Sequence, residues 1–277
     1  MQHDNFLDYK LFLKLKKKKK DNSKSIALII GGTGRIGSVF TNQLVYQDRY
    51  VISFSRNNEN FKRYKSKLPK NKQKFLKWHY LDLSNFDSIN NASNFIKSNF
   101  SEINFFVNAG SISNRGKNVN YNEKSISNEF YRISGGVIIF LESIIDLMRN
   151  NENYSKVINV SSFWGKVAPN FKTYLEMDIS PSLLASYGKA GMEHLIKYLA
   201  VREAENKILA NTLMPGWFPR KGPVERKDYM SNINEKVPLN KIGRLIDLVP
   251  AVEFLLNQNN QYFTGQSVIV DGGYTIW

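Results

Sequence analysis

Residues 26–37, Ile26-Ala27-Leu28-Ile29-Ile30-Gly31-Gly32-Thr33-Gly34-Arg35-Ile36-Gly37, decide the fold of this chain. The five apolar residues at the start of this stretch predict a short buried strand. Directly after the glycines, Ile36, Phe40 and Leu44 recur at a spacing of four residues, which predicts a helix with one apolar face. A strand, a glycine-rich turn and a helix that packs back on the strand form the first unit of an α/β sheet.

The glycines of this turn also predict a ligand. Gly32, Gly34 and Gly37 have the G-x-G-x-x-G spacing, which permits a tight turn, a close approach of a pyrophosphate to backbone N–H groups, and close packing of helix on strand. The positive end of the helix dipole then favours phosphate. The alternative is an ordinary strand-to-helix turn, but the position between a predicted strand and a predicted helix favours nucleotide binding.

From Ser25 onward, short apolar or β-branched runs alternate with longer segments of helical period, a pattern typical of a parallel sheet covered on both faces. We therefore expect one domain over residues 25–277, an α/β doubly wound Rossmann fold with a seven-stranded parallel sheet. The expected strands are Ile26 to Ile30, Tyr50 to Ser55, Phe75 to Leu81, Ile103 to Val107, Lys156 to Val160, Ile208 to Leu213 and Ser267 to Val270. The longest helix is expected over about Leu183 to Glu205, where Gly188 and Gly191 indicate close packing against another surface.

The composition excludes several classes of site and partner. The chain has no cysteine and three histidines, so neither a disulfide nor a thiolate or histidine-rich metal site is expected. No apolar run is long enough to span a membrane, and no secretory signal precedes the domain, so we expect a cytoplasmic protein. The net charge of +15 is uneven: residues 1–24 hold eight lysines against three aspartates. We interpret this stretch as a solvated, disordered tail, and we expect no nucleic-acid partner.

The end of the second expected strand predicts which dinucleotide is preferred. About twenty residues beyond the glycines, where an acidic residue commonly binds the ribose hydroxyls of NAD, the chain has Ser55 and Arg56. The Arg56 guanidinium is suited to pair with a 2′-phosphate, and Arg35 in the glycine turn is a second candidate. The alternative is that Arg56 is only a solvated loop cation. We expect NADP(H) to be preferred, with NAD(H) as the alternative cofactor.

Several further motifs, in order along the chain, resemble those of the short-chain dehydrogenase/reductase (SDR) family. They are Asp82-Leu83, Asn108-Ala109-Gly110, Pro215-Gly216, Phe263-Thr264-Gly265-Gln266 and Val270-Asp271-Gly272-Gly273. The resemblance covers all but the tail and points to the single-domain branch. Within the family, Ala168-Pro169-Asn170-Phe171 with Tyr174 resembles bacterial members linked to surface-glycan or flagellin sugar biosynthesis.

The resemblance implies an NAD(P)-dependent oxidoreductase that acts on a small-molecule carbonyl or hydroxyl substrate and forms a homodimer or homotetramer. The cofactor-binding residues that it implies, together with those argued above, are Gly31, Gly32, Thr33, Gly34, Arg35, Ile36, Gly37, Ser55, Arg56, Asp82, Leu83, Asn108, Ala109, Gly110, Lys189, Pro215 and Gly216. No metal is expected.

The resemblance also implies a catalytic serine, tyrosine and lysine. Reduction of a carbonyl by hydride leaves an alkoxide, so the site needs an acid at that oxygen and a donor to orient it. Ser162, in Ser161-Ser162-Phe163-Trp164-Gly165, matches the family serine, and Lys189 in Lys189-Ala190-Gly191 matches the family lysine. The lysine would favour the tyrosinate and lower a tyrosine pKa from about 10. The family tyrosine stands four residues before the lysine, where this chain has Ala185.

Two tyrosines are candidates for the missing acid. Tyr187 stands two residues before Lys189, and two helical residues are rotated by about 200° from one another, so Tyr187 can serve only if the helix begins late or is distorted. Otherwise Tyr187 is a packing residue. Tyr174, twelve residues after Ser162, is the second candidate. The family asparagine is also missing, since Ile133 and Ser134 occupy its neighbourhood.

The sequence thus leaves three hypotheses. The first is an NADP(H)-dependent oxidoreductase in which Ser162 orients the substrate oxygen, Lys189 holds the nicotinamide ribose and a displaced tyrosine such as Tyr187 is the acid. The second is a dinucleotide-binding SDR-like protein with impaired catalysis that acts as a sensor or partner subunit, which Ala185 favours. The third, a nucleic-acid binder, depends only on the basic charge and would require steep salt dependence of binding.

Overall fold

The computed structural model describes residues 25–110, 121–174, 181–219 and 233–277. The expected basic tail over residues 1–24 lies outside the described residues, as do residues 220–232 between the sixth and seventh strands. No helix among the described residues is both long and apolar enough to cross a membrane.

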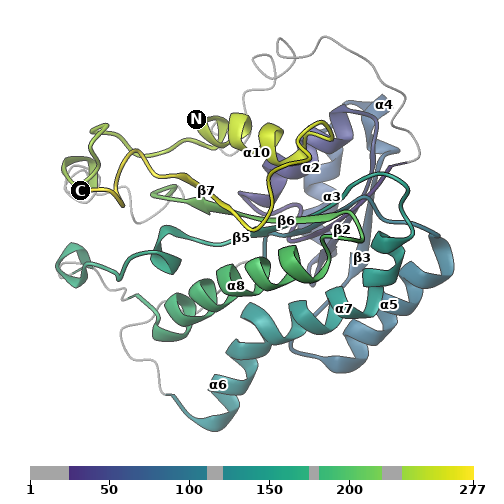
Figure 1. Cartoon of the computed structure of the whole chain (residues 1–277), viewed down its shortest axis with the longest axis horizontal. Coiled ribbons are helices and arrows are strands. Elements are labelled where there is room, and N and C mark those ends of the chain that lie inside the picture. Colours follow the sequence, from purple (N-terminus) through teal and green to yellow (C-terminus); the bar gives the residue numbers. More distant parts are fainter. Residues whose placement is uncertain (1–24, 111–120, 175–180, 220–232) are drawn as a thin grey trace.

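The domain is built on one seven-stranded sheet with all strands parallel, in the order β3-β2-β1-β4-β5-β6-β7 (Figure 1). The strands are β1 (Ile26–Ile30), β2 (Tyr50–Ser55), β3 (Leu76–Tyr80), β4 (Phe105–Asn108), β5 (Ser155–Val160), β6 (Ile208–Pro215) and β7 (Ser267–Val270). All seven expected strands are present, and three of them have the expected bounds. The doubly wound Rossmann fold predicted from the sequence is therefore confirmed.

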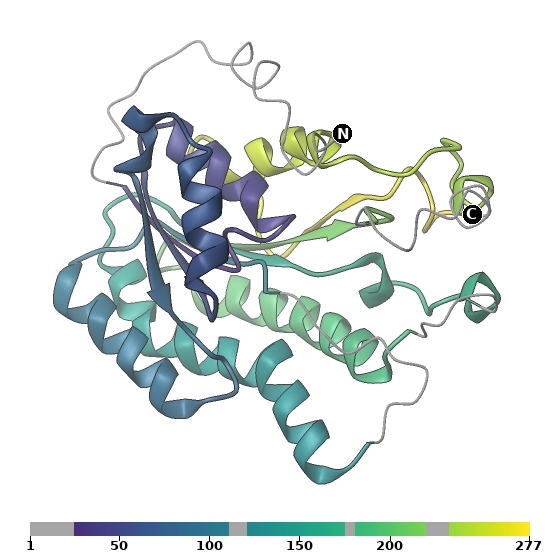
Figure 2. The ribbon, with the colours of Figure 1, turned by 180° about the vertical axis from the view of Figure 1, so that it is seen from behind.

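Helices cover both faces of this sheet (Figures 1 and 2). One face carries α2 (Gly37–Tyr46), α3 (Asn58–Ser66) and α10 (Val249–Leu256), and the other carries α5 (Phe86–Asn99), α7 (Gly136–Arg149) and α8 (Leu183–Arg202). The shorter elements are α4 (Lys70–Gln73), α6 (Glu123–Phe130), the π-helix η1 (Tyr131–Gly135) and the 3₁₀ turns η2 (Phe163–Gly165), η3 (Phe171–Tyr174) and η4 (Leu245–Leu248). Each face has its own apolar core: Phe40 and Leu44 of α2 lie in one, and Phe140 of α7 and Ile196 of α8 lie in the other.

The order of the strands fixes where a ligand can bind. Strand order reverses between β1 and β4, and open α/β sheets bind ligands in the crevice outside the carboxyl ends of the strands at such a point. The glycine turn, residues 31–37, follows β1 at this reversal, and Asn108 ends β4 beside it. The fold therefore places the predicted nucleotide motif where a dinucleotide site is expected.

Helices α6 and α7 form one continuous run with the π-helix η1 between them. Gly136 at the start of α7 is required by packing, because a Cβ at this position would lie 2.1 Å from the carbonyl oxygen of Leu83. Ile133 of η1 contacts α8 at Gly188, where an added Cβ would lie 2.1 Å from Ile133 Cγ2. The expected packing at Gly188 is confirmed. Gly191 has no such neighbour among the described residues, because a Cβ there would meet no atom of theirs within 4 Å, and close packing at this position stays a prediction.

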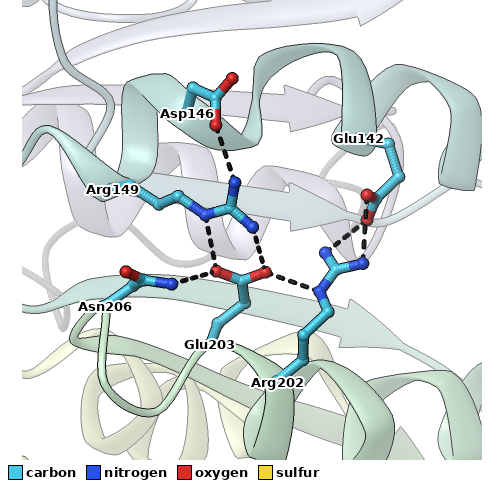
Figure 3. Close-up of polar contacts among 6 residues, drawn as sticks. All are labelled: Glu142, Asp146, Arg149, Arg202, Glu203 and Asn206. Carbon is cyan, nitrogen blue, oxygen red and sulfur yellow. Dashed lines mark hydrogen bonds and ion pairs between the residues drawn. The ribbon is translucent and has the colours of Figure 1, made fainter.

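A network of charged side chains joins the carboxyl ends of α7 and α8 (Figure 3). The Glu203 carboxylate is fully buried and accepts hydrogen bonds from Arg149, at 2.7 and 2.9 Å, and from Arg202 at 2.6 Å. Asn206 donates a further bond to it at 2.9 Å. Arg202 also pairs with Glu142 on α7, so both helices are tied to one carboxylate. We call this network the α7–α8 clasp. It holds the carboxyl ends of α7 and α8 together on one face of the sheet.

Candidate active site

The glycine turn brings the backbone of β1 and the first turn of α2 into very close contact. Gly31 has a φ of +72°, a conformation that residues with a side chain rarely adopt. A Cβ on Gly37 would lie 2.1 Å from the Gly31 carbonyl oxygen, so no larger residue fits. Gly34 donates its N–H to the same oxygen at 2.9 Å. These contacts are the physical reason for the glycine spacing, and Gly34 at the tip of the turn is exposed.

The amino end of α2 fits an anionic ligand. Its N-cap, Ile36, has no side chain that accepts a hydrogen bond. Within the described residues, the N–H groups of Ile36 and Gly37 also have no acceptor. Unpaired N–H groups at the positive end of a helix dipole favour phosphate. The residues present therefore fit the pyrophosphate of a dinucleotide.

The other predicted cofactor residues gather at the same edge of the sheet. Each follows or ends a strand at its carboxyl end: Ser55 and Arg56 at β2, Asp82 and Leu83 at β3, Asn108, Ala109 and Gly110 at β4, and Pro215 and Gly216 at β6. Ala109 donates its N–H to Ile30, and a Cβ on Gly31 would lie 2.8 Å from the Ala109 oxygen. The fold thus brings together segments that are far apart in the sequence.

Arg56 is available for a ligand at the β2 end of this edge. Its side chain is 53% exposed, and its Nη1 lies 4.0 Å from Asp82 Oδ2. Burial raises the pKa of Asp82, but hydrogen bonds from Ser84 and the nearby guanidinium groups of Arg56 and Arg132 outweigh burial and hold this pKa below its ordinary value. An exposed pair of this length stabilises the fold weakly. A phosphate could therefore take the place of Asp82 as the partner of Arg56 at small cost.

Arg35, the second candidate for the phosphate, is directed elsewhere. Its Nη1 donates a hydrogen bond to the carbonyl oxygen of Phe218, in the loop that follows β6. Arg35 thus links the glycine turn to the segment after Pro215-Gly216, and binding of a phosphate would require it to leave this contact. Of the two predicted arginines, Arg56 is the one whose guanidinium is mostly exposed to solvent.

The serine and lysine motifs lie together at the end of β5. The Lys189 Nζ donates to the carbonyl oxygen of Val160 at 2.8 Å, and Ser161 Oγ donates to the Lys189 carbonyl at 3.0 Å. Gly165 permits this contact, since a Cβ there would lie 3.2 Å from the Lys189 backbone. Ser162 caps the η2 turn, and its Oγ accepts the Trp164 N–H at 3.3 Å. Two of the three predicted catalytic residues, Ser162 and Lys189, therefore belong to one packed unit.

Tyr187 is not brought to this unit. Helix α8 is an uninterrupted α-helix that begins at Leu183, with Ser182 Oγ accepting the Ala185 N–H at 3.2 Å. Tyr187 could be catalytic only if this helix began late or were distorted, and α8 does neither. Tyr187 is 63% exposed and lines a groove of 590 Å³ between α6 and α8, whereas Ala185 is 7% exposed. Ala185, four residues before Lys189, is on the buried side.

Tyr174 lies much closer to the predicted reaction centre than Tyr187 does. It is buried in η3, with ring centroids 5.9 Å from Trp164 and 6.0 Å from Trp217. Trp164 follows Ser162 by two residues, and Trp217 follows Gly216 directly. The second candidate from the sequence is thus next to both the serine motif and the Pro-Gly motif.

Five aromatic side chains pack together beside the serine motif, and the sequence did not predict that they form a cluster. We call them the aromatic cluster; they are Phe163, Trp164, Tyr174, Trp217 and Tyr274. Tyr274 packs on Phe163 at 5.0 Å between centroids, and burial raises the pKa of its hydroxyl. A raised pKa makes this hydroxyl a weaker acid, the opposite of what carbonyl reduction requires. The available signal was that aromatic residues follow the serine, Pro-Gly and Asp-Gly-Gly motifs directly.

A family model described as enoyl-(acyl carrier protein) reductase matches residues 34–275, which include every motif discussed above except the first part of the glycine turn. The chain belongs to the short-chain dehydrogenase/reductase family. It is therefore an SDR-type NAD(P)-dependent oxidoreductase by family. The motifs quoted from the sequence agree with this assignment, and most of them lie together at the carboxyl edge of the sheet.

Three similar proteins show the range of this SDR chain's relatives. It is 26% identical to post-translational flagellin modification protein A of Campylobacter coli, over 90% of this chain and 97% of that protein, in agreement with the subgroup resemblance. A short-chain dehydrogenase of Leptospira borgpetersenii with bound NAD⁺ has a TM-score of 0.77 at 23% identity, covering 94% of this chain and 98% of that one. A Pseudomonas aeruginosa short chain oxidoreductase with bound NADPH, described as containing an atypical catalytic center, has a TM-score of 0.76 at 18% identity, covering 93% and 99%.

Proposed function

We propose that this SDR protein binds NADP(H) and transfers hydride to or from a carbonyl or hydroxyl substrate, including a sugar derivative, at a rate limited by the missing acid. The single observation that carries the cofactor assignment is the open glycine turn with the exposed Arg56 at the same sheet edge. NADP(H), when bound, supplies or accepts the hydride. Ser162 would orient the substrate oxygen, and Lys189 would hold the nicotinamide ribose.

The distribution of charge favours the phosphorylated dinucleotide. Between Arg56 and Lys77 the chain has nine lysines and arginines and one acidic residue, Glu59, so this stretch alone has a net charge of +8 out of the +15 of the whole chain. It begins with Arg56 at the end of β2, runs through α3 and α4, and reaches β3 where that strand pairs with the start of β2. The positive charge of this part of the domain raises the local concentration of an anionic cofactor.

Replacement of Arg56 by alanine is expected to weaken NADPH binding about 10- to 100-fold, because a hydrogen bond between charged groups contributes about 1.5–3 kcal/mol. NADH affinity should change less than about twofold. Both dissociation constants are obtained by titration of the nicotinamide fluorescence. Arg63→Ala is the matched control, since it removes the same charge from the exposed surface of α3. Equal affinities of the parent protein for NADPH and NADH, or equal losses in the two variants, would contradict the assignment.

A second function is favoured by one observation, the alanine at the position of the family tyrosine. Ala185 is buried on the side of α8 that also carries the Lys189 contact, and its methyl group cannot donate a proton. A protein that keeps the cofactor and lacks the acid could act as a sensor of NADP(H) or as a partner subunit. The relative with an atypical catalytic center indicates that changes at this centre occur on the same fold.

We also propose that a second copy of the chain covers the exposed face of α8 and α6, giving the homodimer expected from the family. This face exposes large apolar side chains: Ile126 and Phe130 on α6, and Leu183, Tyr187, Tyr198 and Val201 on α8. Gly191 lies in the middle of α8, and a glycine inside a helix costs about 1 kcal/mol relative to alanine. Because no atom of the described residues lies within 4 Å of a Cβ at Gly191, a helix of a second copy could approach there closely.

Substitution of Gly191 by leucine is therefore expected to convert the dimer to a monomer in sedimentation velocity, with the helix content unchanged. In a monomer the same change would be neutral or stabilising, because leucine is a good helix former and meets no clash. Lys97→Leu on the exposed side of α5 is the control for an added leucine. A parent protein that is monomeric at all concentrations, or a Gly191→Leu variant that remains dimeric, would contradict this interface.

A further inference from the structure

A second pocket opens beyond the aromatic cluster, and none of the residues that line it was predicted to bind the cofactor or to take part in catalysis. It has a volume of 360 Å³ and lies between the segment 167–170, the pair Glu235 and Lys236, and the C-terminal residues 274–277. Its lining belongs entirely to the described part of the chain. The volume is at the lower end of the range for small-molecule sites. We call it the distal pocket.

Tyr274 connects the distal pocket to the reaction centre. Its ring lines the pocket and also packs on Phe163, the neighbour of Ser162, at 5.0 Å between centroids. The same ring lies 6.1 Å from that of Trp217, the neighbour of Gly216. A substrate with its reacting carbon beside Ser162 would therefore extend past Tyr274 toward the distal pocket.

The wall of this pocket is held by hydrogen bonds between two distant segments. Trp277 Nε1 donates to the Lys236 carbonyl at 3.2 Å, and Leu239 donates its N–H to the Gly272 carbonyl at 3.2 Å. The Asp271 carboxylate accepts the N–H groups of Gly273 and Thr275, both at 2.8 Å. These contacts fix the positions of the side chains that face the pocket.

The polar groups of the pocket are available to a ligand. Within the described residues, neither the Glu235 carboxylate nor the Thr275 hydroxyl has a hydrogen-bond or ion-pair partner. The Lys236 Nζ donates one bond, to Thr173 Oγ1 at 3.1 Å, and an ammonium group has two further donors. Asn170, which also lines the pocket, adds a side-chain amide. Hydrogen-bond acceptors and donors thus line the same pocket as Tyr274, whose ring contacts Phe163.

We infer that the distal pocket binds the hydroxyl-bearing part of a polyhydroxylated substrate, a sugar or an alditol. Vicinal hydroxyls can donate to Glu235 and accept from Lys236 and Asn170, while the C–H groups pack on the ring of Tyr274. An acyl chain or a steroid would instead desolvate the charged groups of Glu235 and Lys236 without replacing their water partners, which is unfavourable. This inference rests on the proposed function, since the reaction centre at Ser162 gives the substrate its direction.

The test is saturation-transfer NMR on the full chain with D-arabinitol as probe and cyclohexanol, which has a single hydroxyl, as comparison. Glu235→Gln is expected to weaken arabinitol binding about tenfold and Thr275→Val about threefold, because each removes hydrogen bonds to the probe. Glu205→Gln, an equivalent change at an exposed position in the turn between α8 and β6, should have no effect. Unchanged arabinitol binding in both pocket variants, or equally tight binding of cyclohexanol, would overturn the inference.

Measurement with and without NADP⁺ separates this inference from the proposed function. If NADP⁺ binds and arabinitol binding is insensitive to Glu235, only the distal pocket assignment is wrong. If NADP⁺ does not bind but arabinitol still depends on Glu235, the pocket assignment stands and the cofactor proposal is wrong. Thermal melts of the four proteins establish that each variant is folded, because both pocket side chains lie at the surface of the domain.

Discussion

Ala185→Tyr is expected to raise the rate of carbonyl reduction by about 10² to 10⁴, which is the usual contribution of a general acid. The new phenol would stand four residues before Lys189, and residues at that spacing lie on one face of a helix. The side of α8 that carries Ala185 is the one that faces the packed unit of the serine and lysine motifs, since Lys189 Nζ reaches the Val160 carbonyl from there. The lysine cation would lower the tyrosine pKa toward neutral pH.

This result is measured as the steady-state oxidation of NADPH with butane-2,3-dione, a generic dicarbonyl, over a range of pH. Tyr187→Phe is the first control and should change the rate little, because Tyr187 faces the α6–α8 groove. Tyr174→Phe is the second, since Tyr174 lies in the aromatic cluster and is the other candidate acid. Loss of activity in Tyr187→Phe without a gain in Ala185→Tyr would show that α8 is distorted in solution. A melting curve of Ala185→Tyr detects overpacking at this buried position.

Glu203→Gln is expected to lower the free energy of unfolding by about 2–3 kcal/mol. Removing one partner of a buried ion pair typically costs about 3–5 kcal/mol. The expected loss is smaller here because the guanidinium groups of Arg149 and Arg202 are partly exposed and keep Asp146 and Glu142 as partners (Figure 3). Asp146→Asn is the matched control: that carboxylate is exposed, and its loss should cost less than about 1 kcal/mol. Urea unfolding of the three proteins gives these differences, and equal stabilities would contradict the α7–α8 clasp.

The stabilisation by the Glu203 carboxylate is expected to depend on pH. Hydrogen bonds from Arg149 lower the pKa of Glu203 from 4.5 to about 2, against the opposing effect of burial. Since the pKa of the folded state lies below that of the unfolded state, the stabilisation is complete above pH 4.5 and is lost as the pH falls toward 2. The stability difference between parent and Glu203→Gln should therefore shrink over that range. A stability difference that stays constant from about pH 6 to about pH 3 would show that Glu203 does not titrate as expected.

The sheet could be predicted from the sequence because its strands are nearly continuous apolar runs. Ile26–Ile30, Tyr50–Ser55 and Ser267–Val270 have the bounds that their composition indicates. The strand after Phe75 is one residue shorter at each end, and β6 continues through Pro215 beside β7 after β5 has ended opposite Leu213, where the missing N–H of proline costs no hydrogen bond. The sequence did not predict the π-helix η1, which is followed by Gly136, a residue that packs on Leu83 in a distant segment of the chain.

The candidate site was predictable only where one short motif carries the chemistry. The glycine turn, Arg56, Ser162 and Lys189 each lie at the end of a strand or in a recognisable motif, so their residues could be named in advance. The aromatic cluster and the distal pocket could not be named, because they combine residues 163–174, 217, 235–236 and 274–277, which come together only through the fold. Whether Tyr187 faces Lys189 likewise depended on where α8 begins, which the sequence left open.

The central claim is that this SDR protein keeps its NADP(H) site and lacks the acid that the family places before Lys189. The most direct measurement mixes the parent protein with NADPH and butane-2,3-dione in a stopped-flow instrument and follows nicotinamide fluorescence and absorbance together. We predict a rapid fluorescence change from cofactor binding, followed by oxidation of NADPH that is slower than in Ala185→Tyr by about 10² or more. Absence of the binding phase, or oxidation by the parent protein as fast as by Ala185→Tyr, would contradict the account.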